Sequence, residues 1–76
     1  MNKNRTYRIF LRKEKEGIYT VIVPSLPGCI TWGENVEHAI DMAKEAIGAY
    51  VEVLKEDGEP IPDDSETFEY SLQLSA

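Results

Sequence analysis

Apolar and polar residues alternate along two segments near the start of the chain, residues 6–12 and 18–23. Each segment places three apolar side chains on one side, namely Tyr7, Ile9 and Leu11 in the first and Tyr19, Val21 and Val23 in the second. A period of two is typical of a half-buried strand. Because the charged residues 13–17 (KEKEG) lie between the segments, the pattern predicts an antiparallel hairpin with a short loop.

A corner rich in proline and glycine, VPSLPGC, follows the second strand. Pro24 ends that strand because proline has no backbone N–H to donate. Pro27 fixes φ and Gly28 permits positive φ, which together favour a turn. Residues 29–32 then predict a third strand, closed by Gly33, so the three strands form an antiparallel meander.

From Val36 onward the apolar period changes to about 3.6 residues, which predicts a helix of some six turns. Asn35 is a suitable N-cap, and Gly58 is a natural residue to end the helix. The predicted apolar stripe consists of Val36, Ile40, Ala43, Ile47, Tyr50 and Leu54, flanked by Ala39, Ala46 and Val53.

A last alternating segment, residues 67–74, predicts a fourth strand, with Phe68, Tyr70, Leu72 and Leu74 on one side. The expected fold class is therefore α+β with the order β-β-β-α-β. One long helix would pack on a four-stranded, mainly antiparallel sheet of strand order 3-2-1-4 with a right-handed crossover. At 76 residues, the chain is expected to form a single domain spanning 1–76, without a separate DNA-binding module.

Charge is distributed unevenly along the chain, whose net charge is −6. Residues 1–33 contain six Lys or Arg and two Asp or Glu, whereas residues 34–76 contain two Lys and twelve acids, which gives +4 and −10. An acidic surface repels nucleic acid and attracts basic proteins, so we expect no direct nucleic-acid binding. A solvated helix face accounts for about half of the acidic excess.

The composition predicts a cytoplasmic protein without a cofactor or a metal. No apolar run is long enough to cross a bilayer, and the first residues, MNKNRTYR, lack the apolar segment of a signal peptide. Cys29 is the one cysteine, and it is expected to be a small buried apolar residue rather than a metal ligand.

Taken together, the proline corner, the helix start and the closing EDGEPIP resemble the N-terminal domain of the HicB family of antitoxins over nearly the whole chain. The structural motif includes Pro24, Leu26, Pro27, Gly28, Cys29, Gly33, Asn35 and Gly58, and the other matching residues are Glu34, Glu37, Ala39, Asp57, Glu59, Ile61 and Pro62. One departure is His38, which stands where the family often has the Glu of a capping box, so the reciprocal half of the box is expected to be absent.

The resemblance implies a degenerate, partial ribonuclease H-like fold and a partner, a small basic RNA-cleaving toxin of the HicA type. Neutralisation would cover the active site of the toxin. The alternative is a free-standing, homo-oligomeric HicB-like protein with a different partner or no toxin. Many HicB antitoxins also carry a C-terminal DNA-binding module, and that function is not carried over to this chain.

An enzymatic function is not expected. Ribonuclease H chemistry needs several carboxylates on neighbouring strands to hold metal ions, yet residues 7–12 contain no acid and the predicted fourth strand contains only Glu69. A nucleophilic pair of Cys29 and His38 has no evident orienting group. His38 is expected to be a surface or capping side chain.

Five residues are predicted to contact the partner: Trp32, Glu34, Asp63, Asp64 and Glu66. The acids were chosen as charges outside the solvated helix face, and Trp32 because so small a core is unlikely to enclose it fully. Phe10 and Ile22 fall on the sheet face opposite the core, which predicts a homodimer or higher homo-oligomer.

Overall fold

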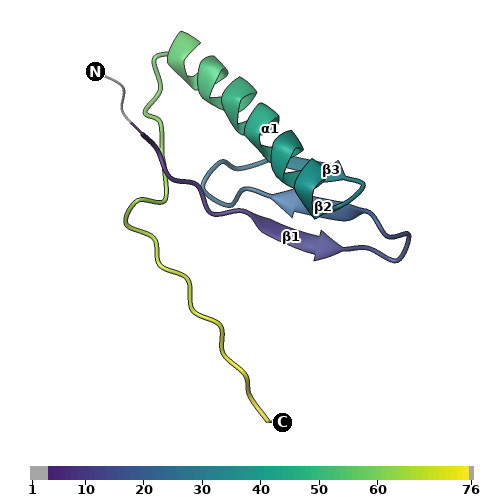
Figure 1. Cartoon of the computed structure of the whole chain (residues 1–76). Coiled ribbons are helices and arrows are strands. Elements are labelled where there is room, and N and C mark those ends of the chain that lie inside the picture. Colours follow the sequence, from purple (N-terminus) through teal and green to yellow (C-terminus); the bar gives the residue numbers. More distant parts are fainter. Residues whose placement is uncertain (1–3, 76) are drawn as a thin grey trace.

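The computed structural model describes residues 4–75 and contains one helix packed on a three-stranded antiparallel sheet (Figure 1). The strand order is β1-β2-β3. The elements are β1 (Phe10–Lys13), β2 (Tyr19–Ile22), β3 (Ile30–Gly33) and α1 (Val36–Glu56). The predicted α+β class, the meander and the long helix are confirmed.

The first strand begins later than predicted, at Phe10 rather than Thr6. The backbone of the preceding residues bonds to the loop after the helix instead of to a strand. The Thr6 carbonyl accepts a hydrogen bond from the Asp64 N–H at 2.7 Å, and the Arg8 N–H donates to the Asp64 carboxylate at 2.8 Å. The alternation of apolar and polar residues therefore begins before the strand, in residues that are extended but lie outside the sheet.

One half of the core lies between α1 and the middle of the sheet, where Val21, Ala39 and Ala43 are buried together. The small alanines let the helix approach the strands closely. Gly33 makes this approach possible, because a Cβ at that position would overlap the backbone of Ala39. The predicted stripe is only partly correct, since Val36 and Ile40 at its N-terminal end are exposed.

The other half of the core is built by the proline corner. Leu26 is fully buried with Val23 and Cys29, against the C-terminal half of α1. Three backbone hydrogen bonds of 2.9–3.1 Å close the corner on itself, and Gly28 has the positive φ (82°) that the turn requires. The corner is therefore a packed part of the core as well as a turn.

Both ends of α1 are capped, as the sequence predicts. The Asn35 side chain accepts a hydrogen bond from the His38 N–H at 2.8 Å. At the other end, Gly58 (φ 68°) donates to the Lys55 carbonyl and Glu59 to the Leu54 carbonyl, the two bonds of a Schellman motif. These caps fix the points at which the chain enters and leaves the helix.

The predicted fourth strand is wrong, because no residue from 57 to 75 belongs to a strand. Residues 67–75 form an extended C-terminal arm (yellow in Figure 1) that makes no ladder with β1. Its apolar side chains at positions 68, 70, 72 and 74 are all exposed. Alternation correctly predicts the extended backbone, but a strand also needs a partner, and the arm has none within the described chain.

Candidate partner-binding surface

The loop between α1 and the arm is held against the start of the chain by three long-range hydrogen bonds to side chains. The Tyr7 hydroxyl donates to the Pro62 carbonyl (2.8 Å), the Arg8 N–H donates to the Asp64 carboxylate, and the Arg8 guanidinium donates to the Thr67 carbonyl (3.1 Å). Burial is the main reason that the pKa of Tyr7 is raised. The three hydrogen bonds therefore fix the position of this loop relative to the segment before β1.

Asp64 does not have the position that the sequence predicts for it. It is only 5% exposed, and its carboxylate is bonded to the Arg8 backbone. The expectation that Asp64 is an exposed loop charge is wrong. Burial of the carboxylate is possible because the Arg8 N–H supplies the hydrogen-bond donor that a buried carboxylate needs. Asp64 positions the loop rather than presenting its charge to a partner.

Its neighbours Asp63 and Glu66 remain accessible, Asp63 half-buried and Glu66 exposed. The Asp63 carboxylate accepts hydrogen bonds from the Ser65 N–H (3.2 Å) and hydroxyl (2.9 Å). These two bonds, with a smaller contribution from the charge of Arg5, hold the pKa of Asp63 below its usual value. The side of the loop that faces solvent is therefore anionic at neutral pH.

The other predicted contact residues lie elsewhere. Trp32, on β3, is 53% exposed, and Glu34 is exposed directly after that strand. The register places Trp32 opposite Thr20 and Thr20 opposite Arg12, whereas the loop is bonded to residues before β1. The structure therefore places the two predicted groups at opposite ends and opposite edges of the sheet.

The two residues considered as a nucleophilic pair, His38 and Cys29, have separate structural roles. His38 Nδ1 accepts a hydrogen bond from the Glu34 N–H at 3.0 Å, one residue before the N-cap Asn35. The histidine is therefore a capping side chain, one of the two roles expected for it. Cys29 is buried at the other end of β3, and burial raises the pKa of its thiol. The strand Ile30–Gly33 separates the two side chains.

An apolar surface on the sheet is larger than the sequence indicated. On the outer face, which α1 does not cover, the register aligns Phe10, Ile22 and Ile30 in one row across all three strands. All three side chains are exposed, and Trp32 lies on the same face. Ile30 was missed because its strand is too short to show a clear alternation.

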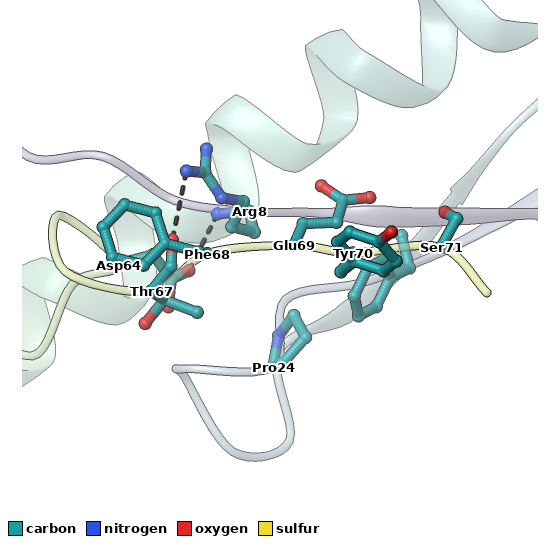
Figure 2. A pocket seen from close by; sticks show the side chains of 9 residues that line it. Arg8, Pro24, Asp64, Thr67, Phe68, Glu69, Tyr70 and Ser71 are labelled. Carbon is teal, nitrogen blue, oxygen red and sulfur yellow. Dashed lines mark hydrogen bonds between the residues drawn. The ribbon is translucent and has the colours of Figure 1, made fainter.

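A groove of about 360 Å³ adjoins this face, between the start of β1 and the arm. Arg8, Phe10 and Pro24 line one side, and residues 67–71 line the other. Figure 2 shows Arg8 bonded to Asp64 and Thr67 at one end of the groove, with Tyr70 and Ser71 at the other. The groove is open to solvent, and the rings of its aromatic residues form the apolar part of its lining.

Two further findings concern residues 4–75 only. These residues contain no group of three or more His, Cys, Asp or Glu side chains placed to hold a metal ion. Within the same range, α1 is not apolar enough to be a membrane span.

Comparisons with known proteins identify a family and a similar fold. A family model described as the HicB-like antitoxin of bacterial toxin–antitoxin systems matches residues 7–74. The N-terminal domain of the antitoxin HicB from Burkholderia pseudomallei is similar in structure, with a TM-score of 0.67 and 36% identity, over 87% of this chain and 72% of that chain.

Two curated relatives differ in length. A UPF0150 protein of Thermoplasma acidophilum is 46% identical over 59 residues, which cover 78% of this chain and 86% of the relative. Antitoxin HicB 1 of Photorhabdus laumondii is 38% identical over 60 residues, which cover 79% of this chain but only 39% of that antitoxin.

Proposed function

This chain belongs to the HicB-like antitoxin family of bacterial toxin–antitoxin systems, and we propose that it binds and neutralises a small basic RNA-cleaving toxin of the HicA type. In this proposal the chain acts in the cytoplasm as a binding protein rather than as an enzyme, and it works as a homodimer or higher homo-oligomer. The ribonuclease H-like description of its fold is a further expectation from the family resemblance.

The observation that carries the proposal is the exposed acidic charge of residues 34–76. Ten of the twelve acids in this range are exposed, the exceptions being Asp63 and Asp64. Among the described residues only one ion pair forms, between Lys55 and Glu52 at 3.9 Å. Most of the negative charge is therefore free to attract a basic partner.

Neutralisation follows from this electrostatic match together with an apolar contact. An RNA-cleaving protein needs a basic face to hold its anionic substrate, and the acidic antitoxin surface would compete with RNA for that face. Trp32 is the proposed anchor, since large exposed aromatic side chains dominate the energetics of many interfaces. Glu34 beside Trp32, and Asp63 and Glu66 on the loop, are the proposed electrostatic contacts.

Binding kinetics at several salt concentrations test the proposal. The purified chain is measured against a small basic RNA-cleaving protein of the HicA type, which is sought first in the gene next to its own. We expect the association rate to fall as salt rises, because salt screens the attraction between exposed charges over about 8 Å at physiological ionic strength. No binding at any salt concentration would favour the alternative, a HicB-like protein with a different partner or none.

A further inference from the structure

The chain exposes more surface than a folded monomer of its size should. Its accessible area is 6322 Å², whereas a monomer of 8.6 kDa is expected to expose about 4,700 Å². Its radius of gyration is 14.3 Å, against about 11.4 Å for a compact domain of this length. The excess of roughly 1,600 Å² is comparable with the area that one subunit buries in an obligate dimer.

The arm contributes four large apolar side chains to this exposed area. Phe68, Tyr70, Leu72 and Leu74 are 76–88% exposed, and all four share one side of an extended segment. A strand with one apolar side normally packs that side on a core. Here the arm passes beside the start of β1 and lines the same groove, yet its apolar side chains stay uncovered by their own chain.

A matching surface exists on the sheet. Strand β1 pairs with β2 on one side, and within residues 4–75 no strand lies along its other edge. A free edge presents unpaired N–H and C=O groups that can accept another strand. Next to this edge, Phe10 and Ile22 begin the exposed apolar row of the outer face.

We propose that two copies of this chain pair reciprocally, with the arm of each adding as a strand to the β1 edge of the other. The apolar side of the arm would then lie beside Phe10 and extend the exposed apolar row that Phe10 begins. A second copy is the favoured partner because it carries both unpartnered surfaces, so one symmetric contact satisfies the arm and the edge of each chain. Exchange of an identical element is a low-cost route to a dimer.

The base of the arm is suited to this exchange. Hydrogen bonds from Arg8 fix the chain at Asp64 and Thr67, while no hydrogen bond holds residues 68–75 to the rest of the described chain. The arm therefore leaves from a fixed point and can reach a neighbouring molecule. Trp32 lies two strands away from the β1 edge, so the exchange leaves the proposed toxin anchor uncovered.

Sedimentation velocity of the chain alone, over a range of protein concentrations, tests the proposal without a toxin. The wild type should sediment as a dimer. Leu72→Asp should weaken dimerisation by roughly tenfold to a hundredfold, since it places a charge on the apolar side of the arm. Ser71→Asp, on the polar side of the same arm, is the matched control and should dimerise like the wild type. Both residues are exposed, so circular dichroism should show unchanged folding.

Disulfide cross-linking distinguishes exchange from other dimers. Phe10→Cys and Tyr70→Cys are made in separate, differently tagged chains in which Cys29 is replaced by Ala, and the two proteins are mixed and oxidised. Reciprocal exchange predicts a disulfide between the two different chains. A monomeric wild type, equal effects of Leu72→Asp and Ser71→Asp, or no mixed disulfide would each overturn the proposal. A monomer that needs the arm to bind a toxin would overturn it as well.

Discussion

The carboxylate of Asp64 accepts a hydrogen bond from the backbone N–H of Arg8, 56 residues earlier in the chain, at 2.8 Å. This contact joins the loop after the helix to the segment before the first strand. It explains why an acid that resembles an ordinary loop charge in the sequence is 5% exposed in the structure.

Asp64→Ala should therefore lower the free energy of unfolding by about 1–3 kcal/mol, because it leaves a partly buried N–H without a partner. Glu66→Ala removes an exposed charge from the same loop and should change stability by less than about 0.5 kcal/mol. Urea unfolding of both variants checks the prediction. Equal stability of the two would show that the Asp64 contact does not hold the loop.

Gly33→Ala should destabilise the protein because the added methyl group would overlap the backbone of Ala39. Overpacking of this kind costs about 1–3 kcal/mol. Gly48→Ala is the matched control, since nothing lies within 4 Å of its position on the helix, and it should stabilise by about 0.5–1 kcal/mol. The midpoint temperature of thermal unfolding should thus fall for Gly33→Ala and rise for Gly48→Ala. A shift of both midpoints in the same direction would contradict the packing described for α1.

The limits of sequence-based prediction follow from the range of the interactions involved. The helix and its caps were predictable because period, N-cap and C-terminal glycine are local signals. The fourth strand was not predictable in this way. Alternation at Phe68 and Tyr70 indicates an extended backbone, but it does not indicate whether another strand lies beside it. The burial of Asp64 depends on Arg8, far away in the sequence, and no local pattern of charges could indicate it.

Asp63 should contribute to stability in a pH-dependent manner. Its folded-state pKa is lowered, mainly by the hydrogen bonds from Ser65, so the folded state binds the proton less readily than the unfolded state. Its contribution is present above the unfolded pKa of about 3.9 and is lost as the pH falls through the folded value. NMR titration of Asp63 should show a pKa nearer the usual value in Ser65→Ala. The variant loses the hydroxyl bond but keeps the Ser65 N–H bond, so an unchanged pKa would contradict the contribution of the hydroxyl.

The two groups of proposed contact residues should affect toxin binding differently. Asp63→Lys combined with Glu66→Lys should slow association, because these charges act at long range. Trp32→Ala should instead speed dissociation by at least roughly tenfold, because it removes the aromatic side chain proposed to become buried as an anchor in the complex. Val53→Ala, an exposed apolar residue on the helix, serves as the control for Trp32. Surface-immobilised kinetics measure both rates, and unchanged binding by both variants would place the interface elsewhere.

Inhibition of RNA cleavage tests the central claim most directly. A small basic RNA-cleaving protein of the HicA type, sought first in the neighbouring gene, is incubated with RNA while increasing amounts of the purified chain are added. Neutralisation predicts that cleavage falls steadily and stops once the toxin is saturated, and that added salt weakens the inhibition. Undiminished cleavage in the presence of saturating antitoxin would contradict the claim that this chain covers the active site of a toxin.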